Sequence, residues 1–582
     1  MSKSKLRLLR RPFLLVLSLL SACAAGGAPA VDGSGSGDSG QASGQVLGQA
    51  YGAFLDARYA DSQFALGQAA EYYREASRAD PGDPVLRQQA FLSSLMAGGS
   101  DAASLARTVP DNQVAMLLLI DQSVLAGDWA GAITEIHALP QEGLTQILAP
   151  LLLAWAEQGA GRTDAALATL QAYLSGPDAR GIDALHAALI ADLAGRTALA
   201  DKFYALAGEG FAVPNLQVAR AIASWQARQG HMAEARATIA ALGTGDSDLG
   251  LAVPGLERDI TARPVASPAQ GMAEAYLAIG ASLREEDAPD FTVILLRLGL
   301  ALNPNLTPAR LLLADVLDSQ NQPQAALDAL APVPDGDPLA PIVALRRAVL
   351  LDHVGRLADA LAILDRVAAS YPTRPEPLEV KGDILRSHEN WQEAITAYDG
   401  AIGRLGTPQP SDWTLFYDRG IAYDQVNEWA RAQPDFQEAL QLQPNEPYVL
   451  NYLGYSWAVQ GRNLGQAHQM IAKAAELRPN DGAILDSLGY VMLRQGDTAG
   501  ALHWLLRAVT LEPDDPTING HLGDAYWAVG NKLAARYQWQ LALSLHPTPS
   551  EAAKLQSKLD GNYGDLGVPP APGASTAESH KP

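Results

Sequence analysis

The feature that most constrains the fold of this chain is a spacing of 34 or 35 residues that several small or helix-ending residues share. Near the C-terminus one glycine, two alanines and one proline return in step, four times each. A period of about 20–50 residues is typical of solenoids, in which each unit buries its apolar face against the next. The four registers are Gly420, Gly454, Gly489 and Gly523; Ala432, Ala467, Ala501 and Ala535; Ala439, Ala474, Ala508 and Ala542; and Pro444, Pro479, Pro513 and Pro547.

The spacing within one period predicts two antiparallel helices. Apolar residues recur at i, i+3, i+4 and i+7, which is the pattern of an amphipathic helix. A glycine in the first helix lets the second helix approach closely, and the alanines keep the second helix slim. A proline ends the second helix, because it cannot continue the hydrogen-bond ladder, and Pro447 or Pro516 opens the next helix at its first turn.

These marks resemble the tetratricopeptide repeat, which has small residues at positions 8, 20 and 27 and proline at position 32. The stretches "LNYLGYSWAVQG", "LDSLGYVMLRQG" and "NGHLGDAYWAVG" each resemble the first helix of that repeat. The resemblance covers about 500 residues and implies an all-α solenoid, a right-handed superhelix of antiparallel helix pairs. As a whole the chain looks like the large tetratricopeptide lipoproteins of alphaproteobacteria.

The period continues upstream, where fewer positions of the pattern are kept. It is seen there in Gly127, Gly161, Gly195 and Gly230. We expect about fourteen units in two blocks, with a shortened second unit over residues 83–110. The predicted segments are an N-terminal block over 46–246, a connector over 247–266, a C-terminal block over 267–548, a capping helix over 549–560 and a disordered tail over 561–582.

The N-terminus has the features of an export signal and contains the single cysteine of the chain, Cys23. Five Lys and Arg residues precede an apolar run over 13–20, which is too short to span a bilayer as a helix. The sequence "LSAC" at 20–23 resembles the lipobox of bacterial lipoproteins. It implies a signal peptide over 1–22 and a lipid anchor on Cys23, on the periplasmic face of the outer membrane. A Gly- and Ser-rich composition predicts a flexible linker over 23–45. A cleaved signal without lipid, leaving a soluble periplasmic protein, is the alternative.

Charge and motifs exclude several functions. The net charge is −22 and no basic patch follows the N-terminus, so nucleic acid is not an expected partner. The chain has no H-E-x-x-H, G-x-S-x-G, P-loop or C-x-x-C motif, and His503 and His521 lie on helix patterns without a second ligand nearby in sequence. We therefore expect no enzyme, no metal and no cofactor. An accessory hydrolase or protease with an unrecognised site is the alternative.

In the resembled family the first helices line a concave groove, and positions 2, 5, 9, 12 and 13 point into it. In this chain those positions carry carboxylates alternating with aromatic rings, which suit proteins or extended peptides with basic or aromatic side chains. The alternative is that the acids only keep the surface solvated. The expected function is a scaffold that holds or assembles envelope proteins, or an adaptor for cell-wall enzymes or polysaccharide export. The predicted groove residues are Glu376, Glu379, Asp383, Tyr417, Asp424, Tyr448, Asn451, Tyr455, Asp486, Tyr490, Asp524 and Trp527.

Overall fold

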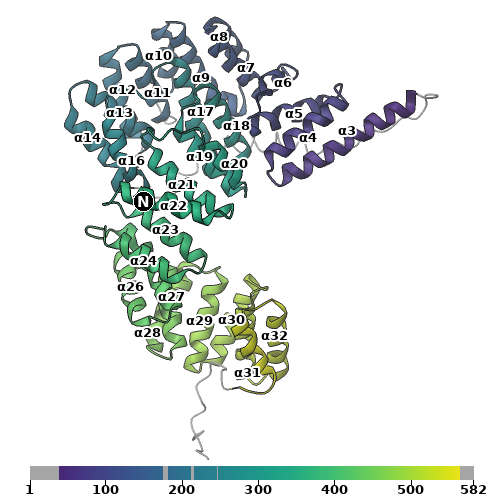
Figure 1. The fold of residues 1–582 in the computed structure, drawn as a ribbon, viewed down its shortest axis with the longest axis vertical. Coiled ribbons are helices and arrows are strands. Elements are labelled where there is room, and N and C mark those ends of the chain that lie inside the picture. Colours follow the sequence, from purple (N-terminus) through teal and green to yellow (C-terminus); the bar gives the residue numbers. More distant parts are fainter. Residues whose placement is uncertain (1–38, 175–180, 211–214, 246, 564–582) are drawn as a thin grey trace, which may run out of the picture. The chain divides into compact units, whose positions relative to one another are not determined.

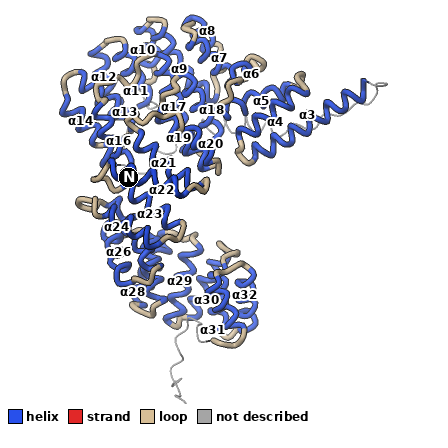
Figure 2. Tube along the Cα trace, in the orientation of Figure 1, coloured by secondary structure: helices blue, strands red, loops and turns tan. Residues whose placement is uncertain are grey.

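The structure, a computed structural model, describes residues 39–174, 181–210, 215–245 and 247–563. All regular structure in these ranges is helical (Figure 2). The chain divides into two compact units, with the boundary between Pro372 and Thr373. The predicted signal peptide, Cys23, most of the predicted linker and the tail from residue 564 onward lie outside the described residues. The end of the predicted linker, residues 39–45, is helical and belongs to α3.

The N-terminal unit holds helices α3 to α22, which follow one another through short loops (Figure 1). Its helices are α3 (Ser39–Ser62), α4 (Leu66–Ala79), α5 (Pro84–Ala97), α6 (Ala102–Ala106), α7 (Gln113–Leu125), α8 (Trp129–His137), α9 (Gly143–Gly159), α10 (Thr163–Gln171), α11 (Gly181–Leu193), α12 (Thr197–Gly210), α13 (Leu216–Arg228), α14 (Met232–Ala240), α15 (Leu242–Gly245), α16 (Ser247–Arg258), α17 (Pro268–Glu285), α18 (Pro289–Leu302), α19 (Thr307–Ser319), α20 (Pro323–Leu330), α21 (Ala340–His353) and α22 (Leu357–Ser370).

The C-terminal unit continues the same alternation. Its helices are α23 (Glu376–Ser387), α24 (Trp391–Ile402), the 3-10 turn η1 (Pro410–Asp412), α25 (Trp413–Gln425), α26 (Trp429–Leu442), α27 (Pro447–Val459), α28 (Leu464–Leu477), α29 (Gly482–Gln495), α30 (Thr498–Leu511), α31 (Pro516–Ala528), α32 (Lys532–Ser544) and α33 (Pro549–Leu559). Helix α33 lies where the sequence predicts a capping helix, and Thr548 and Glu551 close its first turn with reciprocal hydrogen bonds.

Consecutive helices pack in pairs, and we refer to the first helix of a pair as A and the second as B. The described residues contain six pairs from α3 to α14, three from α17 to α22 and five from α23 to α32. These fourteen pairs agree with the expected number of units. The second pair is short, because α6 has only 5 residues.

The glycine register marks the closest approach of helix B to helix A. A Cβ atom added to Gly523 would lie 2.4 Å from the ring of Trp539, and one added to Gly489 would lie 2.6 Å from Leu505. Both of these B-helix side chains are fully buried. The alanine registers are also buried, as expected for positions where the B helix contacts its neighbours. The predicted role of both registers is confirmed.

The glycines that extend the period upstream have a different role. Gly127, Gly161 and Gly195 lie in the turn between helices A and B, with φ of +76°, +75° and +71°. This left-handed conformation is strained for residues with a Cβ atom, so glycine is favoured there. In the turn between α25 and α26 the position is taken by Asn427, at φ +62°, and asparagine tolerates this region better than most residues.

The boundary between compact units lies at Pro372, and residues 247–266 do not separate them. Helix α16 occupies most of that connector, and the chain then returns to the N-terminal repeats. Helix α17 packs against α9 and α11, and α18 packs against α5 and α7. Residues 267–372 therefore share the core of the N-terminal repeats, because their first helix pair is buried against them.

Candidate functional site

In the N-terminal unit, helix α17 packs against two A helices that precede the connector, α9 and α11. Trp155 of α9 is fully buried and donates a hydrogen bond from its indole nitrogen to Nδ1 of His186, at 2.9 Å. A Cβ atom on Gly271 of α17 would lie 2.3 Å from the same indole ring. Only glycine allows α17 to lie this close to α9, so the contact fixes the position of the covering helix.

Polar contacts also join α17 and α18 to the early repeats. The hydroxyl of Tyr276 donates to Asp121 of α7 at 3.1 Å, and both side chains are fully buried. Burial holds the pKa of Asp121 well above its usual range, although the Tyr276 hydrogen bond acts in the opposite direction. On α18, Nε of Arg297 donates to the carbonyl oxygen of Met96 at 3.0 Å. In this unit the A helices α5, α7, α9 and α11 are thus covered by helices of the same chain.

In the C-terminal unit the A helices present aromatic rings. The rings of Tyr455 and Tyr490, on α27 and α29, lie 5.3 Å apart, and the ring of His521 lies 4.6 Å beyond Tyr490. Tyr448 is 40% exposed, and the guanidinium of Arg478 lies 5.3 Å from its ring centre. We call Tyr448, Tyr455 and Tyr490 the tyrosine row. All three keep part of their surface open to solvent.

Most predicted groove carboxylates are bonded within the protein. We call the set of side-chain contacts between successive A helices the A-helix ladder, and each of its polar contacts spans 28–35 residues. The Tyr455–Tyr490 ring contact supplies the step from α27 to α29. The polar contacts are Arg386 with Asp418 at 3.4 Å, Tyr452 with Asp424 at 3.0 Å, His521 with Asp486 at 2.9 Å and Lys558 with Asp524 at 2.7 Å.

The environment of the ladder shifts its titrating groups. Burial raises the pKa of Asp418 to about 7, although Arg386 acts in the opposite direction. Burial alone would lower the pKa of His521, but the carboxylate of Asp486 outweighs it and raises that pKa. The Asp486 carboxylate therefore favours the charged form of His521.

The remaining predicted residues have varied surroundings. Glu376 is buried against Arg374, and Asp383 accepts a hydrogen bond from Tyr398 at 2.8 Å. Trp527 is stacked on Tyr563, with ring centres 4.1 Å apart. Glu379 is half-buried on α23, and the ring centre of Tyr417 lies 6.0 Å from that of Tyr452. The Oδ1 atom of Asn451 is buried and has no hydrogen-bond partner among the described residues.

Sequence reasoning missed the cations of the ladder. The sequence shows His521 only as a histidine with no second metal ligand nearby, and it does not mark Lys558 as a binding residue. Each lies one period from its partner, because 35 residues separate Asp486 from His521 and 34 separate Asp524 from Lys558. A search for opposite charges one repeat apart would have found both pairs.

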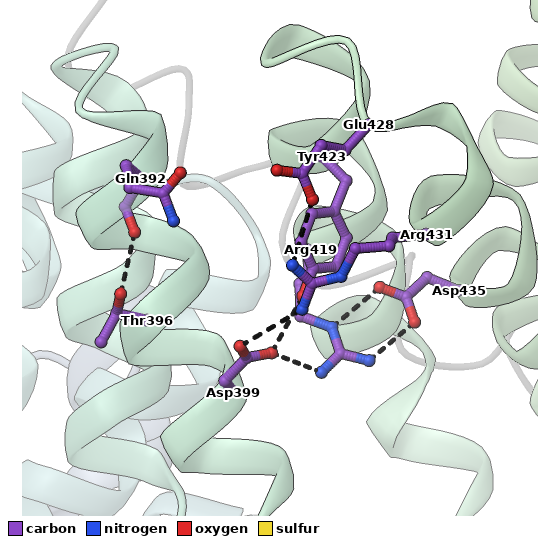
Figure 3. Close-up of polar contacts among 8 residues, drawn as sticks. All are labelled: Gln392, Thr396, Asp399, Arg419, Tyr423, Glu428, Arg431 and Asp435. Carbon is purple, nitrogen blue, oxygen red and sulfur yellow. Dashed lines mark hydrogen bonds and ion pairs between the residues drawn. The ribbon is translucent and has the colours of Figure 1, made fainter.

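A second polar network joins helices α24, α25 and α26 (Figure 3). The guanidinium of Arg419 donates to both carboxylate oxygens of Asp435, at 2.7 and 2.8 Å, and to Asp399 at 2.8 Å. Tyr423 also donates to Asp399, and Arg431 lies 4.1 Å over the Tyr423 ring. Every charged group at the centre of this network has a partner, so we assign it a structural role.

Two features are absent from the described residues: a metal-binding cluster and a membrane-spanning helix. No group of three or more His, Cys, Asp or Glu side chains in the described part of the chain could hold a metal ion. Among the helices described, none has the length and apolar character needed to cross a membrane.

Comparison with known proteins identifies the repeats. The family described as tetratricopeptide repeat-like domain matches residues 303–414, and the family described as tetratricopeptide repeat matches 417–482 and 487–550. A TPR repeat-containing protein of Pseudomonas aeruginosa is 28% identical over 244 residues, which is 42% of this chain and 35% of that protein. Tetratricopeptide repeat protein 13 of Homo sapiens is 34% identical over 102 residues, 18% of this chain and 11% of that protein. The chain thus spans only about a third and a tenth of these relatives.

Solved structures resemble this chain at low similarity. One is the crystal structure of YrrB, a TPR protein with an unusual peptide-binding site, which is 23% identical in sequence. The match covers 30% of this chain and 89% of the YrrB chain, with a TM-score of 0.27. Another is the crystal structure of the APC/C hetero-tetramer Cut9-Hcn1, which is 15% identical. That match covers 88% of this chain and 98% of the matched chain, with a TM-score of 0.37. The three matched stretches between residues 303 and 550 therefore contain tetratricopeptide repeats, and the helix pairs that continue around them form an all-α solenoid.

Proposed function

We propose that the protein is a non-enzymatic scaffold that binds other proteins through the A-helix face of its C-terminal unit. One observation carries this proposal: the tyrosine row remains partly exposed on that face, while the N-terminal unit fills the corresponding face with α17 and α18. Tetratricopeptide repeats serve widely as protein-binding surfaces, so the exposed face is the natural place for a partner.

The chemistry of the row favours an extended peptide with basic or aromatic side chains. Aromatic faces attract cations, and Arg478 already lies over the Tyr448 ring. The net charge of −22 adds a long-range attraction for a basic partner. Because Asp486 and Asp524 are neutralised within the ladder, the rings rather than these acids would make the contacts.

The test is capture of partners from cross-linked bacterial envelopes, followed by binding of the purified partner. Replacing Tyr448, Tyr455 and Tyr490 by Ala should weaken binding at least about tenfold, or ~1.4 kcal/mol. The matched control replaces Tyr51, Tyr59 and Tyr537, which are exposed elsewhere, by Ala. Equal binding by both triple variants, with unchanged circular dichroism, would reject the tyrosine row as the binding surface.

We further propose that the scaffold works in the bacterial cell envelope, as a lipoprotein of the outer membrane facing the periplasm. The support is the export signal and the lipobox-like sequence that ends at Cys23. Its tasks would be holding or assembling envelope proteins, or serving as an adaptor for cell-wall enzymes or polysaccharide export. Wild type should incorporate labelled palmitate and sediment with membranes, whereas Cys23→Ser should do neither. Unlabelled wild type in the soluble periplasmic fraction would favour a cleaved signal without lipid.

A further inference from the structure

The N-terminal unit contains a cavity that the scaffold function does not use. It has a volume of about 240 Å³ and lies where α11, α13 and α16 meet the start of α17 and the loops after α18 and α20. A single buried water needs far less space, so the cavity has room for a small molecule. Its walls combine leucine side chains with a few charged and amide groups, which is the usual make-up of a ligand pocket.

Two of its charged groups face the cavity from opposite helices. Glu274 of α17 is only 9% exposed, and its carboxylate accepts a hydrogen bond from the Gln217 amide at 2.5 Å. Arg220 lies one turn beyond Gln217 on α13 and acts on the Glu274 charge without forming an ion pair within 4.0 Å. Among the described residues, the Arg220 guanidinium has no hydrogen-bond partner. Arg220 is half-buried, and its guanidinium can pair with a carboxylate that enters the cavity.

The other charged groups of the lining are already bonded. Nε of Arg263 lies 3.2 Å from Asp192, and Asp337 accepts a hydrogen bond from Thr307 at 2.6 Å. Arg220 has no such partner among the described residues, and Glu274 accepts its hydrogen bond from Gln217 on one carboxylate oxygen, Oε2, so these two groups can bind the two ends of a ligand. The apolar part of the wall would enclose the body of that ligand; it includes Leu185, Leu189, Leu256, Leu306 and Leu339.

We propose that this cavity binds an apolar amino acid, or a short peptide with free ends. The α-carboxylate of the ligand pairs with Arg220, because a guanidinium offers two parallel donors to a carboxylate. The ammonium group pairs with Glu274, and the aliphatic side chain contacts the leucine wall. A ligand with one charge of each sign matches the two groups, whereas a simple anion would leave Glu274 facing it.

Binding should also stabilise the N-terminal unit. The cavity is bounded by α13 on one side and by α17 on the other, and α17 is the helix that covers the early repeats. A ligand that joins the two helices binds the folded state only, so it adds about 2.7 kcal/mol at 100 times its Kd. This site is independent of the tyrosine row, and its failure would leave the peptide-binding proposal unchanged.

The experiment uses the full chain and three probes: L-leucine, L-leucinamide without the carboxylate, and N-acetyl-L-leucine without the ammonium group. Calorimetry should give L-leucine a Kd on the order of 1 mM or tighter, and each truncated probe a Kd at least about tenfold weaker. Arg220→Gln should weaken L-leucine at least about tenfold and leave L-leucinamide unchanged. Arg236→Gln, an exposed arginine on α14, is the matched control and should change neither.

Glu274→Gln should weaken L-leucine and leave N-acetyl-L-leucine unchanged. Because Glu274 is buried, this variant can fail to fold, and Arg220→Gln then decides alone, since Arg220 has no partner to lose among the described residues. No binding of L-leucine at about ten times the expected Kd would overturn the proposal. Equal binding of all three probes, or an unchanged L-leucine affinity in Arg220→Gln, would also overturn it.

Discussion

The two compact units use the same repeat in different ways. In the N-terminal unit the A-helix face is covered by α17 and α18, and the contacts that hold the cover are buried. In the C-terminal unit successive A helices are joined by the A-helix ladder, and the tyrosine row stays partly exposed. The repeat therefore determines how neighbouring helix pairs stack. Whether the A-helix face of the stack is covered or exposed depends on the helices that follow in the chain.

The difference follows from a few residues. Covering the N-terminal face requires a helix with no side chain where it meets Trp155, and Gly271 meets that need. The C-terminal unit instead has half-buried tyrosines and ion pairs on its A helices, which fit beside one another along the stack. We expect the first arrangement to give a rigid body, and the second a surface that a partner can reach.

The largest effect is expected from Gly271→Leu. Its side chain would overlap the buried Trp155 ring, so α17 would have to move away from α9. We expect the free energy of unfolding of the N-terminal unit to fall by about 3 kcal/mol or more. Hydrogen exchange should show faster exchange in α9, α11 and α17, and unchanged exchange in α25 to α31.

The control for this variant is Gly465→Ala, at an exposed helix position with open space around it. It should slightly stabilise the C-terminal unit, because alanine favours helix more than glycine does. If Gly271→Leu leaves exchange in α9 unchanged, the covering helix is not held by this contact, and the contrast between the two units fails.

A smaller effect is expected from Lys558→Met at the end of the ladder. It leaves the buried Asp524 carboxylate without its cation, 2.7 Å away in the wild type. Such a loss typically costs about 3–5 kcal/mol, but α33 is terminal and can fray, so we expect about 2 kcal/mol. Urea unfolding of the C-terminal unit measures the change. The double variant Asp524→Asn/Lys558→Met should recover part of it, and no recovery would mean that the charge is not the cause.

The stacking of the repeats could be predicted from the sequence because each period repeats the same contact. Gly489 and Gly523 face B-helix side chains in the same way, so spacing alone reveals the geometry. The cover over the N-terminal face could not be predicted this way. Asp121 and Tyr276 are 155 residues apart, and their contact occurs once. A single tertiary contact leaves no periodic signal.

The candidate site was predicted less well than the fold. The predicted residues lie on A helices, but the partners of their charged groups could not be predicted. Asp486 and Asp524 were expected to face a partner, whereas each is bonded to a cation of the next A helix. A position within one repeat does not reveal whether the next repeat offers a counter-charge. The tyrosines, whose rings are only half buried, are the better guide to the surface.

The smallest effect concerns pH and separates the two units without disturbing either core. The pKa of His521 is raised above its usual value of 6.5 by Asp486. Its contribution to stability is therefore complete below about pH 6.5, and it is lost as pH rises through the pKa of the folded state. We expect the C-terminal unit to lose about 1.5 kcal/mol between about pH 6 and pH 9, which is the lower end of the range for a hydrogen bond to a charged group.

His521→Gln removes one titrating group and should reduce this loss, while Asp418, with a pKa raised to about 7, and the N-terminal unit keep their own pH dependence in both proteins. Hydrogen exchange at several pH values measures the two units separately, in α29 and α31 for the C-terminal unit and in α9 and α17 for the N-terminal unit. His503→Gln, an exposed histidine on α30, is the control and should leave the loss in place. A wild-type C-terminal unit whose stability does not change over this range would show that Asp486 does not hold His521 in its charged form, and that the ladder owes little to charge at this step.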